Sequence, residues 1–174
     1  MKTLKKKDDK AGAIVCALLT FLFVLLSVGI QACKSDDKVR TETPENNKKE
    51  EIRNLVSSWA KAWQEAPFNI EPYKALYHTS FRADYKSSSG MDYVQWIADK
   101  MDKAKRAKCI EIYVSNLDVE FRDDLAIATF MQRYVSKIYC DTGVKKLYFK
   151  KFDEGWKIIG EEQPNTSKCN DRCR

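Results

Sequence analysis

The sequence has little of the material from which metal sites and acid–base active sites are usually built. It contains one histidine, His78, and its six cysteines include no Cys-x-x-Cys pair. Structural zinc sites usually draw on closely spaced cysteines and on histidines. His78 stands beside Thr79 near the expected end of a helix, so no histidine–aspartate pair for proton transfer is evident. We therefore expect no metal site, and we interpret His78 as a surface or capping residue.

Signatures of nucleotide and nucleic-acid binding are missing as well. The chain has no glycine-rich phosphate loop and no dinucleotide fingerprint. Its formal net charge of +6 comes partly from the N-terminus, because the part after residue 33 holds 26 basic and 23 acidic residues without a basic stripe. Mixed charges of this kind leave no electrostatic footprint for nucleic acid. We expect neither a cofactor nor a nucleic-acid partner.

The N-terminus does contain a membrane-targeting segment. Residues 11–30 carry no charge and would form a helix about 30 Å long, which is enough to cross a bilayer. The lysines before this run outnumber the acidic residues and should keep the N-terminus in the cytoplasm. The run closes with an Ile-Gln-Ala-Cys sequence that resembles a bacterial lipobox, with Cys33 as the lipid-attachment residue. We therefore interpret residues 1–33 as either a signal anchor or a lipoprotein signal peptide, and both predict export to the periplasmic side of a bacterial membrane.

The exported part divides into three segments. Residues 34–47 are polar and non-periodic, so we interpret them as a tether. Residues 48–163 are long enough for one domain with a single core, and residues 164–174 form a polar tail. The exported cysteines are Cys109, Cys140, Cys169 and Cys173. An even number in an oxidising compartment predicts two disulfides, and the sequence does not choose among the three possible pairings.

Three helices are expected at the start of the domain. The first, about 18 residues long and beginning near Pro44, has an apolar stripe at helical spacing formed by Ile52, Leu55, Val56, Trp59, Ala60 and Trp63. A short second helix covers residues 71–78. A third covers residues 92–107, begins with Asp92 as its cap and has an apolar stripe formed by Tyr93, Trp96, Ile97 and Met101.

From Cys109 onward the pattern changes to that of strands. β-branched and aromatic residues predict strands over residues 110–121, 125–139, 144–152 and 156–161. Residues 122–124, 141–143 and 153–155 have the composition of turns. Three helices followed by an antiparallel meander predict an α+β domain, a cone-like curved sheet of about four strands packed by the helices.

The second strand favours a pocket. Its even-numbered positions from Ala126 to Ile138 suit a face covered by helices, but Gln132 and Ser136 interrupt this row. A buried amide needs partners or water, so these polar groups indicate a wet or ligand-filled pocket at the open end of the cone. A structural glutamine with its hydrogen bonds satisfied, or a row that faces outward, is an equally open alternative.

Several motifs occur in an order that resembles a known domain. The series consists of Trp59 and Trp63, Tyr73 and Tyr77, Phe81, residues 90–96, residues 130–134, Lys146-Leu147, and residues 156–158 with Glu161. It resembles the nuclear-transport-factor-2-like (SnoaL-like) accessory domain at the C-terminus of bacterial L,D-transpeptidase-type peptidoglycan enzymes, over residues 51–163. The resemblance implies a cone-shaped, non-catalytic domain that places peptidoglycan or mediates association. The transpeptidase domain, with its catalytic cysteine and histidine, has no counterpart in this sequence, so that activity is not implied.

These observations predict a non-catalytic, membrane-tethered binding module of the envelope whose partner is peptidoglycan or an envelope protein. The expected pocket residues are Tyr77, Trp96, Gln132, Tyr134 and Glu161. Aromatic faces suit sugar rings, whereas amide and carboxylate groups suit peptides. One alternative is an assembly scaffold that forms homo-oligomers, similar to periplasmic components of type IV secretion systems. Another is a small-molecule enzyme of the cone fold, with Glu161 and Tyr134 as its candidate acid and phenol.

Overall fold

The computed structural model describes residues 44–83 and 90–173. The helices come first: α1 spans Pro44–Glu65, α2 spans Glu71–Lys74 and α3 spans Tyr93–Ala107. The strands follow as β1 (Ile110–Arg122), β2 (Leu125–Ser136), β3 (Cys140–Phe152), β4 (Gly155–Glu162) and β5 (Thr166–Lys168). The predicted membrane segment and Cys33 lie outside the described residues. Within the ranges that are described, no helix has the length and apolar character needed to cross a membrane.

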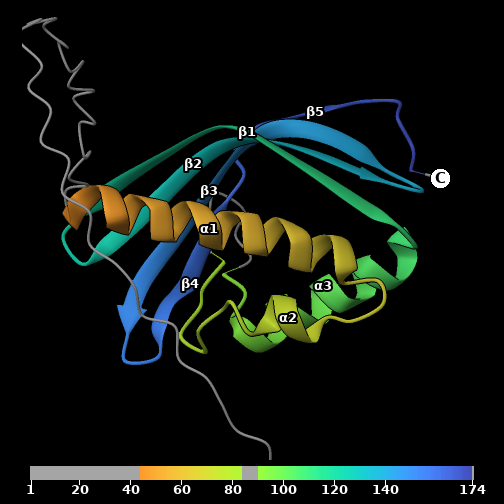
Figure 1. Ribbon diagram of the computed structural model, residues 1–174. Coiled ribbons are helices and arrows are strands. Elements are labelled where there is room, and N and C mark those ends of the chain that lie inside the picture. Colours follow the sequence, from red (N-terminus) through yellow and green to blue (C-terminus); the bar gives the residue numbers. More distant parts are fainter. Residues whose placement is uncertain (1–43, 84–89, 174) are drawn as a thin grey trace, which may run out of the picture. The chain divides into compact units, whose positions relative to one another are not determined.

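The strands form one curved antiparallel sheet. Its order is β1-β2-β3-β4, and β5 pairs with the part of the β3 edge that β4 leaves free. α1 runs across the sheet, and α2 and α3 lie near the C-terminal half of α1 (Figure 1). The predicted α+β fold with a four-strand meander is therefore confirmed. The short β5 was not predicted, because a strand of three residues is too short to show a periodic pattern.

α1 is held in place by its apolar stripe, as predicted. Ile52, Val56 and Trp59 are at most 1% exposed. They share one core with Ala126 and Ala128 of β2, whose small side chains let a helix lie close to the sheet. Because α1 begins at Pro44, residues 44–47 of the predicted tether are helical.

α2 is shorter than predicted because the chain after it pairs with the sheet. The N–H of His78 donates to the carbonyl of Ile158 at 3.0 Å, and the N–H of Ile158 donates to the carbonyl of Leu76 at 2.8 Å. These bonds take backbone groups that a longer helix would use, so α2 ends at Lys74. The pairing also covers an edge of β4, which would otherwise be open.

α3 begins where the sequence predicts. The side chain of Asp92 accepts a hydrogen bond from the N–H of Gln95, and the side chain of Gln95 accepts one from the N–H of Asp92. This reciprocal capping box satisfies two backbone donors at the helix start. The predicted apolar stripe is only partly correct, since Ile97 is buried but Met101 is 37% exposed.

The connection between β2 and β3 was predicted in the wrong place. The chain turns over residues 137–139, where the Oγ of Ser136 accepts a hydrogen bond from the N–H of Tyr139 at 2.9 Å. Residues 141–143, which have the composition of a turn, lie in β3 instead. The correction matters because it places Asp141 in the sheet, directly opposite Tyr134.

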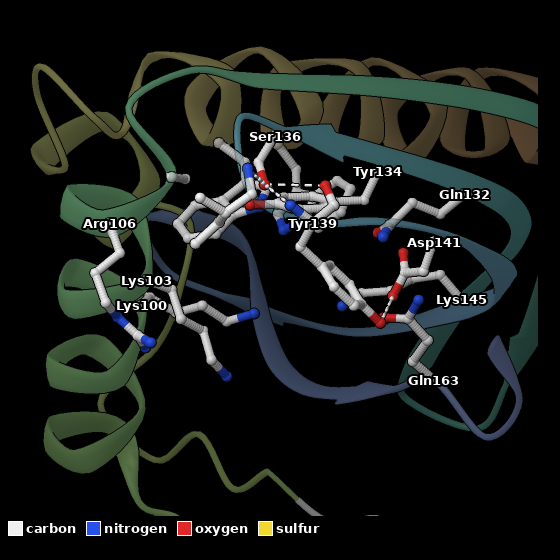
Figure 2. A pocket seen from close by; sticks show the side chains of 14 residues that line it. Lys100, Lys103, Arg106, Gln132, Tyr134, Ser136, Tyr139, Asp141, Lys145 and Gln163 are labelled. Carbon is white, nitrogen blue, oxygen red and sulfur yellow. Dashed lines mark hydrogen bonds between the residues drawn. The ribbon is translucent and has the colours of Figure 1, made fainter. Parts of the chain in front are cut away.

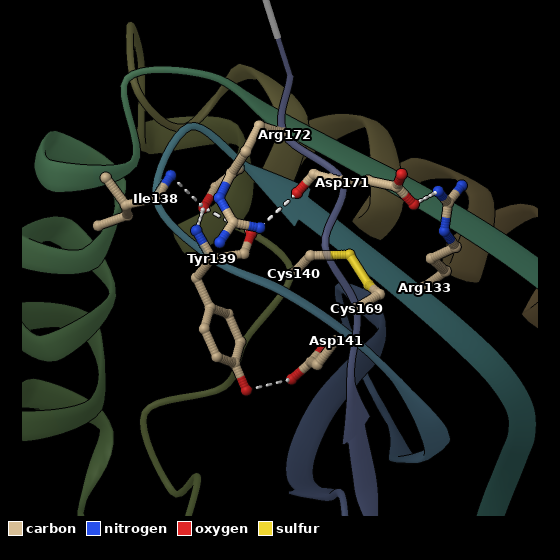
Figure 3. The surroundings of a disulfide bond; sticks show 9 residues. Arg133, Ile138, Tyr139, Cys140, Asp141, Cys169, Asp171 and Arg172 are labelled. Carbon is tan, nitrogen blue, oxygen red and sulfur yellow. Dashed lines mark hydrogen bonds and ion pairs between the residues drawn. A yellow bond between two sulfur atoms is a disulfide. The ribbon is translucent and has the colours of Figure 1, made fainter.

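The C-terminal segment is joined to the rest of the domain by two disulfides, Cys109–Cys173 and Cys140–Cys169. Figure 3 shows the second of them. The four cysteines pack with Val135 in a second small core. Val135 lies on the face of β2 opposite to Tyr134, because neighbouring residues of a strand point to opposite faces. Close by, β5 pairs with β3 at Gly143, where a Cβ would lie 2.1 Å from the carbonyl oxygen of Asn165. Much of the predicted tail therefore belongs to the fold.

The disulfide pairing can be read directly from a tryptic digest of the unreduced chain. Cleavage after Lys108, Lys137, Lys168 and Arg172 puts each exported cysteine on a peptide of its own. Mass spectrometry should find the peptide 109–122 linked to 173–174, and the peptide 138–145 linked to 169–172. A link between the peptides 169–172 and 173–174 would contradict the structure.

Replacing Cys109 and Cys173 together by serine should lower the free energy of unfolding by about 2–4 kcal/mol, because their disulfide closes a long loop in the unfolded chain. The two cysteines are 64 residues apart in the sequence. Urea unfolding of the full chain measures the effect, with Cys16→Ser as a control that breaks neither disulfide. An unchanged unfolding midpoint in the double variant would contradict the prediction.

Candidate ligand-binding pocket

A pocket of about 580 Å³ opens on the concave face of the sheet, between the strands and the helices α1 and α3 (Figure 2). Its lining combines aromatic, amide and charged side chains. The lining residues are Trp59, Trp63, Lys100, Lys103, Arg106, Ala107, Gln132, Tyr134, Ser136, Ile138, Tyr139, Asp141, Lys145 and Gln163.

The wall that the sheet contributes follows from strand alternation. Gln132, Tyr134 and Ser136 are two residues apart on β2, so all three side chains point to the same face. On the neighbouring strand β3, Asp141 pairs with Tyr134 and points into the same pocket. The hydroxyl of Tyr139 donates to Asp141 Oδ2 at 3.1 Å, which fixes the orientation of this carboxylate (Figure 2).

The opposite wall carries cations from α3. Lys100, Lys103 and Arg106 are three residues apart, a spacing that places them on one side of a helix. Lys103 forms an ion pair with Asp99 at 2.7 Å, and Arg106 forms one with Asp102 at 2.8 Å. These two cations are therefore largely balanced within α3 itself.

Lys100 has a different environment. Its amine lies 4.1 Å from the ring centre of Trp96 and 5.1 Å from that of Trp63, which favours a cation. Among the described residues its amine has no hydrogen-bond or ion-pair partner. Burial lowers the pKa of Lys100 to about 7, against the opposing attraction of the Glu161 carboxylate.

Beneath the pocket lies a buried network centred on Glu161 of β4. The hydroxyls of Tyr73 and Tyr77 donate to its Oε1, and the amine of Lys145 donates to its Oε2. The indole N–H of Trp59 in turn donates to the hydroxyl of Tyr77 at 3.0 Å. Lys145 belongs both to this network and to the pocket lining, so it connects the two.

The network keeps Glu161 ionised although it is only 4% exposed. Burial by itself raises the pKa of a carboxyl group, but the charges of Lys145 and Lys100 and the hydrogen bonds from Lys145 and Tyr77 outweigh it and lower the pKa to about 2. Burial, together with the negative charge of Glu161, raises the pKa of the Tyr73 and Tyr77 hydroxyls well above the ordinary value. Both tyrosines are thus neutral donors.

Glu161→Gln should lower the free energy of unfolding at neutral pH by about 3 kcal/mol, because it leaves the Lys145 ammonium buried without its counter-charge. The wild-type contribution depends on pH. The pKa of the carboxyl is lower in the folded chain than its usual 4.5, so the stabilisation is present above about pH 4.5 and is lost as the pH falls toward 2. Urea unfolding between pH 2 and 7 measures both effects.

Glu162→Gln is the matched control for that experiment. Glu162 is the next residue on β4 and accepts a hydrogen bond from the hydroxyl of Tyr148 at 2.9 Å, at a partly exposed position. Its replacement should cost much less. Equal losses in the two variants, or a Glu161→Gln variant that keeps the full acid-dependent loss of stability, would contradict the assignment of a buried ion pair.

The predicted pocket residues separate into three groups. Gln132 and Tyr134 line the pocket. Glu161 lies beneath it and reaches it through Lys145. Tyr77 and Trp96 do not line it: Tyr77 is buried in the Glu161 network, and the ring of Trp96 lies against the amine of Lys100.

The candidate acid–phenol pair is not formed. Glu161 accepts hydrogen bonds from Tyr73 and Tyr77, and within the described residues it forms none with Tyr134. His78 does not line the pocket either. Its ring stacks on Phe152 with 3.8 Å between ring centres, and its Nδ1 lies 2.7 Å from the hydroxyl of Ser80.

The charged residues of the pocket were not among the predicted site residues. Asp141 was assigned to a turn, and Lys145 was not considered because a buried lysine on a strand resembles any other strand lysine in sequence. The spacing of Lys100, Lys103 and Arg106 was visible, but a charged helix face usually faces solvent. One set of metal-ligating side chains comes together within the described residues, Cys140, Cys169 and Asp171, and the disulfide occupies both of its sulfur atoms.

Comparisons with known proteins identify the family of the domain. Residues 51–162 match the family model described as the Cds6 C-terminal NTF2-like domain. Bd1075 from Bdellovibrio bacteriovorus is 28% identical, with a TM-score of 0.59, over 68% of this chain and 40% of that one. The helical cell shape determining protein Pgp2 from Campylobacter jejuni is 21% identical, with a TM-score of 0.53, over 63% of this chain and 38% of that one. This chain thus spans less than half the length of either protein.

The same fold also occurs in a protein from Streptomyces avermitilis that is assigned as a dehydratase of the NTF2-like family. It is 13% identical, with a TM-score of 0.62, over 74% of this chain and all of that one. No curated protein matches the sequence. The comparisons confirm the predicted nuclear-transport-factor-2-like domain, whereas the similarity to L,D-transpeptidase enzymes stays a prediction.

Proposed function

Because this chain belongs to the family of Cds6 C-terminal NTF2-like domains, we propose that it is a non-catalytic binding module of the bacterial envelope whose pocket holds peptidoglycan. The observation that carries the proposal is the composition of the pocket lining. Trp59, Trp63 and Tyr134 contribute aromatic rings to the lining, of which Tyr134 is the most exposed, and Gln132 and Gln163 contribute amides. Sugar rings pack on aromatic faces, and peptides bond to amides, so the pocket suits a polymer that contains both.

An envelope location is supported by three features. The disulfides Cys109–Cys173 and Cys140–Cys169 are of the kind that persists in oxidising compartments outside the cytoplasm. The predicted anchor of residues 1–33, with Cys33 as the possible lipid attachment, would hold the domain at a membrane. The fold is also that of a helical cell shape determining protein, and the shape of a bacterial cell is maintained by its peptidoglycan.

Binding rather than catalysis is supported by the state of the buried acid. A general acid or base works best when its pKa lies near the working pH. The pKa of Glu161 is lowered to about 2, and the hydrogen bonds of its carboxylate engage Tyr73, Tyr77 and Lys145. The fold itself permits enzymes, as the dehydratase assignment of a relative indicates, so this argument rests on the residues and not on the fold.

Retention on insoluble, purified peptidoglycan tests the proposal. The full chain should co-sediment with the polymer, and Tyr134→Ala should weaken retention about tenfold or more, because it removes an aromatic face from the pocket. The amount of protein in the pellet, measured over a range of peptidoglycan concentrations, gives the affinity.

Tyr113→Ala is the matched control. Tyr113 lies on β1 and pairs with Arg133, the residue before Tyr134 on β2. Its side chain is therefore on the other face of the sheet from Tyr134, where it is 50% exposed. Its loss should leave retention unchanged. No sedimentation of the wild-type chain, or equal losses for Tyr113→Ala and Tyr134→Ala, would refute the proposal.

A further inference from the structure

Two opposite charges in the pocket lack an ionic partner. Lys103, Arg106 and Lys145 are each paired with a carboxylate from the same chain. The amine of Lys100 and the carboxylate of Asp141 are not, as far as residues 44–83 and 90–173 show, and they form no ion pair with each other. The pocket thus presents one cation on its α3 wall and one anion on its sheet wall that form no ion pair among the described residues.

Two buried atoms of the pocket lining also lack hydrogen bonds. Asp141 is only 8% exposed, and its Oδ1 has no hydrogen-bond partner among the described residues, nor does Nε2 of Gln163. A buried polar atom without a partner is costly and rare in native proteins. The Oδ1 atom requires a donor and the Nε2 atom requires an acceptor, so a ligand that satisfies both must carry both kinds of group.

We propose that the pocket recognises a free α-amino acid centre, that is, one carbon carrying both an ammonium and a carboxylate group. The ammonium donates to Asp141 Oδ1, and the carboxylate accepts from Gln163 Nε2 and faces the Lys100 amine. Such a centre occurs in amino acids and at the unlinked end of a diamino acid within a peptide. The inference names the ligand chemistry of the pocket proposed above to hold peptidoglycan, and in that sense it rests on the proposed function.

Other ligand classes satisfy fewer of these groups. A simple anion could pair with Lys100, but it would leave Asp141 Oδ1 without a donor and add a like charge beside it. A neutral sugar could bond to both unpartnered atoms, Asp141 Oδ1 and Gln163 Nε2. It would still leave the charges of Lys100 and Asp141 without counter-charges in a poorly hydrated place. The zwitterion supplies a donor, an acceptor and both counter-charges at once.

The titration of the two groups agrees with the geometry. Burial raises the pKa of Asp141 against the attraction of Lys145 and Lys100, and burial lowers the pKa of Lys100 to about 7 against the attraction of Glu161. Each shift means that the charged form is poorly compensated in the ligand-free pocket. A bound zwitterion would compensate both.

Binding of leucine and its two blocked forms tests the inference. Leucine presents the zwitterion on an apolar side chain that Trp59 and Ile138 could cover, whereas N-acetylleucine lacks the ammonium and leucinamide lacks the carboxylate. The indole signals of Trp59 and Trp63 in the ¹H–¹⁵N NMR spectrum of the full chain report occupancy. Each blocked form should bind about tenfold or more weakly than leucine, because each leaves one charge of the pocket unpaired.

Three variants assign the discrimination to residues. Asp141→Asn should abolish the preference for leucine over N-acetylleucine, and Lys100→Met should abolish the preference for leucine over leucinamide. Lys103→Met is the matched control, because Lys103 lies on the same wall but is already paired with Asp99. This variant should keep both preferences.

The outcomes separate this inference from the proposed function. If the wild-type chain binds either blocked form as well as leucine, or binds none of the three, the inference is wrong whatever the variants do, even where peptidoglycan is still retained. If leucine is preferred over both blocked forms but peptidoglycan is not retained, the inference holds and the proposed function fails. Loss of both preferences in Lys103→Met would also overturn the assignment.

Discussion

The carboxylate of Glu161 is a charge in a place where burial alone would neutralise it. It stays ionised because a lysine and two tyrosines donate to it, and these partners come from different parts of the chain: Tyr73 from α2, Tyr77 from the segment that pairs with β4, and Lys145 from β3. Trp59 of α1 extends the network through Tyr77. The charge is therefore satisfied only when helices and sheet are assembled together, and any arrangement that separates them leaves a buried ion unpaired.

The pocket lies next to this network and shares Lys145 with it. Lys145 reaches from the buried carboxylate to the pocket floor, and above it α3 presents Lys100 over the indoles of Trp63 and Trp96. Lys145 forms its ion pair with Glu161 inside the fold. Lys100 forms no ion pair among the described residues, so its charge is available to a ligand. One buried pair thus stabilises the domain, and the remaining charges, Lys100 and Asp141, give the pocket its polarity.

The disulfides act on the same pocket from the other face of the sheet. Cys140 precedes Asp141 and is bonded to Cys169 (Figure 3). Cys169 follows β5, which begins three residues after Gln163. The bond therefore holds together the two segments that carry the orphan atoms of the pocket wall. A small domain with a ligand-sized hollow in its core has less apolar burial to rely on, and covalent links compensate for that loss.

The sequence by itself determined the three helices, the four long strands, their order and the apolar stripe of α1, because each of these follows from periodicity and local turn or capping chemistry. It also indicated a polar pocket from Gln132 and Ser136. Only the tertiary structure decided the disulfide pairing, the end of α2, and the place of Asp141 and Lys145, because these depend on groups that are distant in the chain. The backbone hydrogen bonds between His78 and Ile158 end α2, and the bond from Tyr139 to Ser136 Oγ sets the turn before β3, against the local composition. Which charged groups are buried, and which of them are paired, follows only from the packing of helices against the sheet.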